Sequence, residues 1–258
     1  MLAEGVTALL AGWPEPVGAV GVALPATCDA AGTVTVWPGR PSWVGLDLAT
    51  ALGELFPGVP VGWADDGDLA ALAEADAAGC PDVVYFGVGT GIGGGVVLSG
   101  RSWPGFTRGS CEVGHLVVDR SGPRCDCGRR GCVQAVASGP ATLRRAGELR
   151  GAPVIFAELC EATRAGAAWA VDAVREGCAA LAAAAIGVIE LAHPELVVVG
   201  GGFGAAVPGY RATLEREIRA LGRPGFPPVP VRAAALGGLS SLRGAVLLAE
   251  GRAASRLS

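Results

Sequence analysis

Three of the eight cysteines of this chain and one of its two histidines fall within a short segment, from Gly114 to Cys132. The cysteines follow the pattern Cys125-x-Cys127-x₄-Cys132, and His115 precedes them. Three thiolates and one imidazole suit a structural, tetrahedral zinc ion, and intervening glycines let the chain turn back on itself. The alternative is a set of free thiols in an apolar loop, but this segment also carries aspartates and arginines. The sequence therefore predicts a zinc site formed by His115, Cys125, Cys127 and Cys132.

The amino-acid composition indicates a globular protein and argues against nucleic-acid binding and membrane insertion. About half of the 258 residues are hydrophobic (51%) and the mean hydropathy is +0.46, so a sizeable buried core is expected. The net charge is −4 and arginines form only short pairs, which argues against nucleic acid as a partner. The N-terminus lacks the basic residues of a signal peptide, and the Ala-rich stretch at 178–191 is too short to cross a membrane. We expect a cytoplasmic protein, and in that compartment clustered cysteines more often bind metal than form disulfides.

Expected strands and helices alternate along the chain. Short apolar or alternating runs predict strands, and longer stretches with helical spacing predict helices. Strands are expected at 17–26, 32–37 and 194–204 and on both sides of a glycine turn within 82–100. Helices are expected at 46–56, after the aspartates near residue 66, at 167–192 and at the end of the chain. This order predicts an α/β fold.

Three aspartates, Asp65, Asp66 and Asp68, separate a short apolar run from an Ala/Leu-rich helix. A carboxylate at the end of a strand, in a loop that faces a cleft, can accept the proton of a hydroxyl group. The simpler interpretation is that these aspartates cap the helix, and the residues alone favour that interpretation.

A family resemblance rests on residues 87–141. This segment contains, in order, a glycine turn, a Glu-x-Gly-His unit, the cysteine cluster and a Ser-Gly-Pro. It resembles the signature of the ROK family, which groups bacterial sugar kinases with sugar-responsive repressors, and the likeness covers roughly residues 17–249. The resemblance implies an α/β, actin-like (ribonuclease H-like) fold of two lobes, with sugar and ATP meeting in the interlobe cleft.

One departure from the family concerns the N-terminal lobe. ROK kinases begin with strands that bear an Asp-x-Gly-Gly-Thr phosphate motif, and this sequence has none. Either the sequence is clipped upstream or the protein has lost the element. We expect residues 1–64 to form a truncated N-terminal lobe, covered by a C-terminal helix at about 240–258. Residues 65–239 would form the C-terminal lobe, with the zinc segment and the nucleotide loops.

The resemblance also implies roles for the residues of the acceptor site. Asp66 aligns with the base that takes the proton from the sugar hydroxyl, and Asp65 stands where the family has Asn. Glu112 and His115 match contacts to the sugar, with His115 held in place by the structural Zn²⁺. Gln134 replaces the Glu that makes a third contact in the family; it can still bond a hydroxyl but carries no charge.

Two glycine runs match the nucleotide loops of the family. Glycine lets the backbone approach a phosphate closely. Each run also has an interpretation without a ligand: the first could be a tight hairpin, and the second a turn after a core strand. The first run resembles the second phosphate-binding loop of actin-like kinases and contains Gly89, Thr90, Gly91 and Gly93. The second run resembles the loop on the adenosine side and contains Gly200, Gly201 and Gly202.

Two functions stay open from the sequence. The first is an ATP-dependent kinase, using Mg²⁺, that phosphorylates a hydroxyl of a sugar or sugar-like substrate. The second is a kinase-derived protein that binds a sugar-like ligand without phosphoryl transfer. The missing phosphate motif, Gln134 and Gly39, which stands where ROK kinases have Asn, favour the second. Asp66 and the glycine runs favour the first, which we prefer, and the family leads us to expect a homo-oligomer.

Overall fold

The computed structural model describes residues 2–105 and 109–254, and its largest sheet has five strands in the order β7-β6-β5-β8-β9. β5 pairs in parallel with β8, and β8 with β9, whereas β6 runs antiparallel to both of its neighbours. The strands are β5 (Val83–Val88), β6 (Ile92–Leu98), β7 (Arg101–Trp103), β8 (Leu196–Gly200) and β9 (Val231–Ala233).

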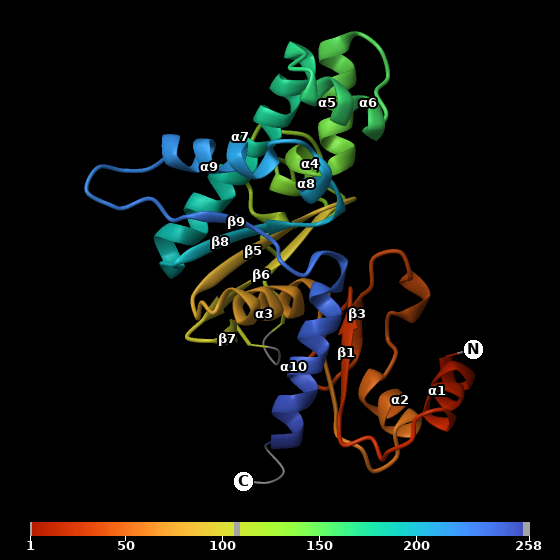
Figure 1. Cartoon of the computed structure of the whole chain (residues 1–258). Helices are drawn as coiled ribbons and strands as arrows, with labels where there is room; N and C mark the ends of the chain where they lie inside the picture. The colour runs from red at the N-terminus through yellow and green to blue at the C-terminus, as the bar shows by residue number, and fades with distance from the viewer. Residues whose placement is uncertain (1, 106–108, 255–258) are drawn as a thin grey trace.

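Helices cover both faces of this sheet (Figure 1). Alternate residues of a strand face opposite sides, so Val83 and Tyr85 pack towards α3 (Asp66–Ala78), whereas Val84 and Phe86 belong to the larger core on the other face. With both faces buried, the central strands are apolar throughout rather than alternating. The larger core is covered by α4 (Val133–Ala137), α5 (Gly139–Arg150), α6 (Phe156–Arg164), α7 (Ala168–Ala192), α8 (Gly202–Ala206) and α9 (Tyr210–Ala220).

The long helix α7 matches the helix expected at 167–192. Alanine dominates it, so it has a high helix propensity and a narrow surface that packs closely on its neighbours. It ends where His193 adopts a left-handed φ of 47° ahead of Pro194. His193 is therefore a helix-end residue.

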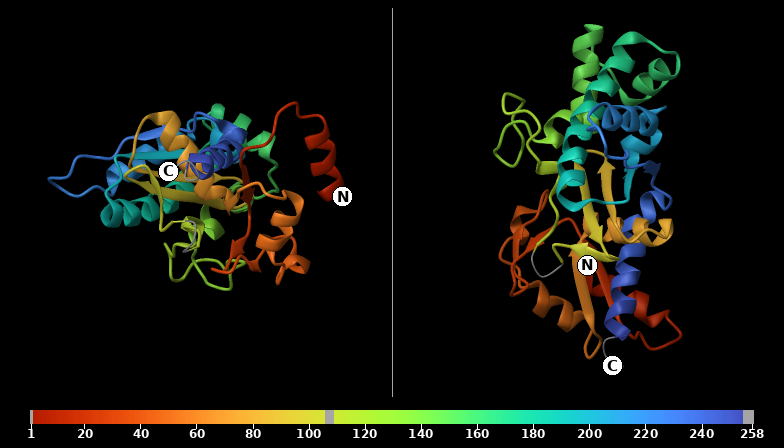
Figure 2. Two further views of the ribbon diagram at one scale, coloured as in Figure 1. Left: turned by 90° about the horizontal axis from the view of Figure 1, so that it is seen from below. Right: turned by 90° about the vertical axis from the view of Figure 1, so that its left-hand side faces the viewer.

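Residues 2–65, about a quarter of the chain, build two small sheets at the opposite end of the molecule from α5 and α6 (Figures 1 and 2). β1 and β4 pair in parallel, and β2 and β3 form an antiparallel pair. Their apolar core contains Leu24, Val34, Leu48 and Leu52. The elements are α1 (Leu2–Ala11), β1 (Val20–Leu24), β2 (Thr27–Cys28), β3 (Val34–Val36), α2 (Leu48–Leu55) and β4 (Val61–Asp65).

The C-terminal helix α10 (Ser240–Ala254) lies against β1, β4 and α3 (Figure 1). The approach is close: a Cβ at Gly21 of β1 would lie 1.8 Å from the carbonyl oxygen of Ala245, and one at Gly244 would lie 2.0 Å from that of Leu69. Residues 255–258 of the expected helix lie outside the described residues. The division into lobes at residues 64 and 65 stays a prediction. No helix in the described part of the chain has the length and apolar character needed to cross a bilayer.

Candidate active site

The three aspartates gather where β4 ends and α3 begins. Asp65 caps α3, because its Oδ1 accepts hydrogen bonds from the backbone N–H of Gly67 at 2.9 Å and of Asp68 at 3.4 Å. Asp68 is only 3% exposed and accepts a hydrogen bond of 3.3 Å from the backbone N–H of Cys111. The capping interpretation is therefore correct for Asp65, but Asp68, which the sequence grouped with the capping residues, is a buried carboxylate that accepts the N–H of Cys111.

These carboxylates stand in an environment that disfavours negative charge. Burial raises the pKa of Asp65 to about 7, with further contributions from the charges of Asp66 and Glu112. Burial, followed by the charges of Asp65 and Glu112, raises the pKa of Asp68 to about 7. The pKa of Asp66 is also raised, mainly by burial. Within residues 2–105 and 109–254, no arginine forms an ion pair with any of the four groups, so a bound cation would relieve their repulsion.

A cavity of about 160 Å³ opens beside Asp65 and Asp68. Its remaining walls are the turn at residues 26–32, Trp63 and the chain at 109–110. The Asp29 carboxylate stabilises the turn, since it accepts hydrogen bonds from the N–H groups of Ala31 and Thr33. This turn comes from the first third of the chain, so the cavity joins segments that are distant in sequence. No motif in the sequence indicated this wall.

The two glycine runs meet at one edge of the five-stranded sheet. β5 and β8 are parallel neighbours, and Gly87 pairs with Gly200, so the turns that follow both strands lie side by side. Contact is close: a Cβ at Gly201, whose φ is +81°, would lie 2.4 Å from the carbonyl oxygen of Val88. The carboxyl ends of parallel strands are the usual place for a bound nucleotide. The structure therefore brings together the two runs that the sequence proposed as nucleotide loops.

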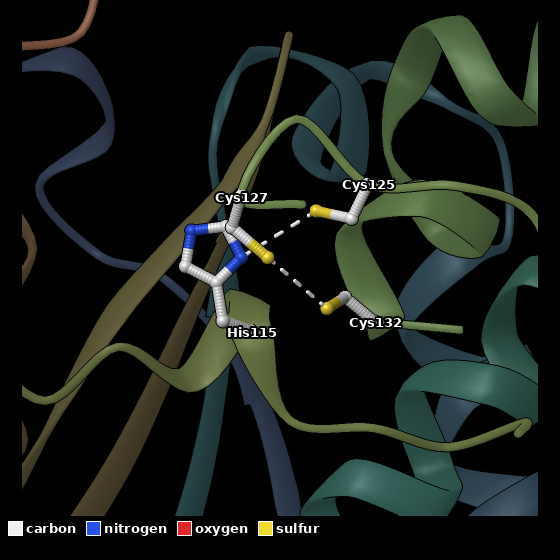
Figure 3. A group of neighbouring side chains, drawn as sticks. All are labelled: His115, Cys125, Cys127 and Cys132. Carbon is white, nitrogen blue, oxygen red and sulfur yellow. Dashed lines mark hydrogen bonds between the residues drawn. The ribbon is translucent and has the colours of Figure 1, made fainter. Parts of the chain in front are cut away.

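The four predicted zinc ligands also come together, as Figure 3 shows. His115 ends the 3₁₀ turn η2 (Val113–His115), and the cysteines lie in the loop that leads into α4. The Nδ1 of His115 is 3.6 Å from the Sγ of Cys125, and the Sγ atoms of Cys127 and Cys132 are also 3.6 Å apart. All four ligand atoms lie within 4.8 Å of one another. Tetrahedral zinc with Zn–S bonds of 2.3 Å requires S–S distances of roughly 3.8 Å, so the donor set fits this metal.

Backbone hydrogen bonds shape the loop that carries these ligands. The N–H of Cys125 donates to the carbonyl oxygen of Arg129, and that of Val118 donates to the carbonyl oxygen of Gly131, both at 2.8 Å. Gly131 has a φ of +70°, and a Cβ there would lie 1.5 Å from the carbonyl oxygen of Asp119. Only glycine fits at this point, which explains why the sequence places one directly before Cys132.

Two of the expected sugar contacts, His115 on η2 and Gln134 on α4, belong to elements that contact β6, the strand after the first glycine turn. Glu112 precedes η2 and accepts a hydrogen bond of 2.8 Å from the hydroxyl of Ser110. Gln134, on α4, is engaged within the protein: its Oε1 accepts a hydrogen bond of 3.0 Å from the backbone N–H of Ile92. The side chain predicted to contact sugar therefore also holds the residue that follows the glycine turn.

Comparison with known proteins identifies the family of this site. The model of the ROK family matches residues 1–252. This chain belongs to the ROK family. Over 234 residues it is 57% identical to a kanosamine kinase of Amycolatopsis mediterranei, covering 91% of this chain and 77% of that protein. Over 205 residues it is 33% identical to a glucokinase of Thermotoga maritima, covering 72% of this chain and 64% of that protein.

Solved structures of ROK proteins have the same fold. A ROK hexokinase from Thermus thermophilus superimposes with a TM-score of 0.85 at 32% identity, covering 98% of this chain and 86% of the other. A ROK glucokinase from Streptomyces griseus, in complex with glucose and AMPPNP, superimposes with a TM-score of 0.77 at 28% identity, covering 97% and 88%. The predicted actin-like α/β fold is confirmed. The preferred function, a ROK-type sugar kinase that uses ATP, is confirmed at the level of the enzyme class.

Proposed function

We propose that this protein transfers the terminal phosphoryl group of ATP to a hydroxyl of an amino sugar of the kanosamine type. The observation that carries the proposal is the carboxylate of Asp65, which lines the cavity directly before Asp66 in the chain. Among the described residues, no arginine forms an ion pair with it. The identity of 57% with a kanosamine kinase supports the same class of acceptor.

Asp66 is the proposed catalytic base. It begins α3 at the end of β4, is half-buried, and directly follows Asp65, which lines the cavity. Burial raises its pKa above the ordinary value for aspartate, which strengthens it as a proton acceptor. In this scheme Asp66 takes the proton of the sugar hydroxyl as that oxygen attacks phosphorus, and the remaining residues hold the reacting groups in line.

Asp65 is the proposed partner of the sugar ammonium group. Its Oδ1 caps α3, so its position is fixed before substrate binds. An Asn at this position, as the ROK resemblance implies for other members, could cap the helix equally well but would present no charge. Asp68, which lines the same cavity, adds to the negative potential there. A substrate ammonium group offsets the carboxylate repulsion, whereas a neutral hexose leaves it uncompensated.

The glycine turns at the ends of β5 and β8 are the proposed phosphate and adenosine loops. Their glycines are Gly89, Gly91 and Gly93 in the first and Gly200 to Gly202 in the second, and because glycine has no side chain a phosphate can come close to the backbone there. The hydroxyl of Thr90, which lies on the surface between the two strands, adds a donor. ATP brings Mg²⁺, whose charge offsets that of the phosphates.

A structural Zn²⁺ held by His115, Cys125, Cys127 and Cys132 is part of the proposal. The Nδ1 of His115 is the ring nitrogen nearest the cysteines, which leaves Nε2 for a hydrogen bond to the sugar. Glu112 precedes the same 3₁₀ turn. A closed four-ligand site would therefore stiffen the segment from which both sugar contacts project.

The experiment measures kcat/KM for kanosamine and for glucose with saturating ATP. We expect wild type to prefer kanosamine, and Asp65→Asn to lower that preference roughly tenfold or more, the size expected for a charge-assisted hydrogen bond. Asp29→Asn is the matched control, because Asp29 lines the same cavity but its carboxylate is engaged in its own turn.

Asp66→Asn separates binding from chemistry. We expect kcat to fall by roughly 10²–10⁴-fold while the sugar still binds. Equal use of both sugars by wild type would contradict the amino-sugar acceptor, and full activity of Asp66→Asn would contradict the assigned base.

A further inference from the structure

The glycine turn between β5 and β6 is anchored by the segment that joins α4 to α5. On one side, the Oε1 of Gln134 accepts a hydrogen bond of 3.0 Å from the N–H of Ile92. On the other side, the N–H of Gly139 donates to the carbonyl oxygen of Gly89 at 2.9 Å. A third bond, from the N–H of Gly89 to the carbonyl oxygen of Gly91, closes the turn at 2.9 Å. Both ends of the turn are therefore fixed by residues 134–139.

Gln134 and Gly91 fit each other closely. A Cβ at Gly91 would lie 2.7 Å from the Oε1 of Gln134, a distance that real Cβ atoms do not reach. A side chain at position 91 would therefore push the flexible end of Gln134 away from the N–H of Ile92. The two residues form a pair in which a change at one alters what the other tolerates.

Ile92 also contacts the segment that carries the expected sugar contacts. It is 4% exposed, and a Cβ at Gly114 of η2 would lie 1.9 Å from its carbonyl oxygen. Its N–H faces α4 and its C=O faces η2, so it lies between them. α4 itself follows directly on Cys132, and the N–H of Val133 donates to the carbonyl oxygen of Leu116 at 2.8 Å. The glycine turn between β5 and β6 (the phosphate turn) and the segment at 112–115 that carries Glu112 and His115 (the acceptor wall) therefore meet at Ile92.

We infer that Gln134 is a positioning residue for the phosphate turn, which it fixes relative to the acceptor wall by holding the N–H of Ile92. The inference rests on the proposed function, in which this turn binds the phosphates of ATP. Without an acceptor at position 134, the buried N–H of Ile92 loses its partner, and the turn shifts to regain one. The phosphates and the acceptor hydroxyl then lose their in-line alignment.

This role differs from the one that the family resemblance implies. A residue that only contacts sugar would affect KM for the sugar. A residue that positions the phosphate turn affects the binding of ATP and kcat, and leaves the affinity for sugar nearly unchanged. The two roles therefore predict opposite patterns of kinetic change.

The test compares Gln134→Leu, which is similar in size but accepts no hydrogen bond, with Gln134→Glu, which keeps an acceptor oxygen. Thr163→Val is the matched control, because it also removes a side-chain hydrogen bond to backbone, 2.7 Å long, but on α6 away from the turn. For Gln134→Leu we expect KM for ATP and the Kd of a non-hydrolysable ATP analogue to rise about tenfold, with KM for the sugar within about twofold. Gln134→Glu and Thr163→Val should stay within about threefold of wild type in each constant.

A double-mutant cycle with Gly91→Ala probes the pair directly. In wild type the added methyl group meets the Oε1 of Gln134, whereas in Gln134→Ala that atom is absent. We expect Gly91→Ala to weaken analogue binding less in the Gln134→Ala background than in wild type, a non-additive result. Binding is measured by calorimetry, so it does not depend on turnover. The cycle uses Gln134→Ala, so it can be measured even if Gln134→Leu folds poorly.

A rise in KM for the sugar alone, with analogue binding unchanged in Gln134→Leu, would overturn the inference and favour a direct sugar contact. Additive effects in the cycle would overturn it as well. Failure of wild type to bind either the ATP analogue or the sugar is a different result, because it would contradict the proposed function itself.

Discussion

The carboxylate of Glu74, on α3, accepts a hydrogen bond of 2.7 Å from the hydroxyl of Ser240, the first residue of α10 and 166 residues further along the chain. The same carboxylate accepts the backbone N–H groups of Ala235 at 2.7 Å and of Leu236 at 3.0 Å. Glu74 is 2% exposed, and its three donors come from the connection between β9 and α10 and from the first residue of α10. It fixes the point at which the chain leaves the large sheet and crosses to the N-terminal strands.

Replacement of Glu74 by Ala should therefore lower the free energy of unfolding by about 3–5 kcal/mol, because it leaves three buried donors without their acceptor. Urea denaturation followed by circular dichroism measures the change. Glu148→Ala, which removes an exposed carboxylate from α5, is the control and should change stability by about 0.5 kcal/mol or less. A loss below about 1 kcal/mol for Glu74→Ala would contradict the anchoring role.

Asp68 should make stability depend on pH in a predictable direction. Its pKa is raised to about 7 in the folded protein by burial and by the charges of Asp65 and Glu112, whereas an unfolded aspartate has a pKa of about 3.9. Between these values the folded state binds more protons, so this group makes the free energy of unfolding fall as pH rises from about 4 to about 7. In Asp68→Asn the amide oxygen still accepts the N–H of Cys111, but this pH dependence is removed.

Denaturation of wild type and Asp68→Asn at several pH values between 4 and 8 measures the effect. We expect the stability of the variant relative to wild type to increase with pH up to about 7 and then to level off. Asp76→Asn, on the exposed face of the same helix, should show a much smaller change. A difference between Asp68→Asn and wild type that stays constant over this range would show that Asp68 is ionised throughout.

Removal of one zinc ligand should remove the metal and much of the local order. We expect about one zinc per chain in wild type and far less in Cys127→Ser, measured by elemental analysis. The melting temperature should fall by roughly 5–10 °C, which corresponds to about 2–4 kcal/mol for a chain of this size. Cys80→Ser, outside the cluster, should keep its zinc. Full zinc content in Cys127→Ser would remove that cysteine from the ligand set.

Thr142 offers a substitution that should stabilise the protein. Its side chain is 1% exposed, and its hydroxyl finds no hydrogen-bond partner among the described residues. Valine has the same shape without the polar atom, so Thr142→Val should raise the free energy of unfolding by about 1–2 kcal/mol. Thr163→Val, which breaks a hydrogen bond of 2.7 Å to the carbonyl oxygen of Leu159, should not do so. A fall in stability for Thr142→Val would indicate a partner for its hydroxyl that the structure does not contain.

The sequence predicted best those features that depend on neighbours in the chain. The cysteine cluster closes within one loop, and the first glycine turn joins two adjacent strands, so spacing alone was sufficient to find both. The helix α7 was equally clear, because its composition and length leave few alternatives. For the same reason the capping role of Asp65 was recognisable from its place before the helix.

Features that depend on contacts between distant segments could not be predicted from the sequence. Gln134 was assigned to the sugar, and nothing in its surroundings indicates that its amide oxygen accepts the N–H of Ile92, 42 residues away. Asp68 was grouped with the capping residues, because its burial depends on contact with the chain near Cys111. The turn around Asp29 lines the cavity together with Asp65 and Asp68, from which it is separated along the chain by β3, α2 and β4.

The seating of α10 has a consequence for how the protein is made. Its glycine-mediated fit against β1 and α3 joins the last helix to segments that leave the ribosome much earlier. At elongation rates of about 5–20 residues per second, roughly 9–35 s separate the synthesis of α3 from that of α10. Throughout that interval the apolar face awaiting α10 has no cover from its native partner. Cotranslational chaperones are therefore expected to bind nascent chains that already contain α3 and to leave once α10 has emerged.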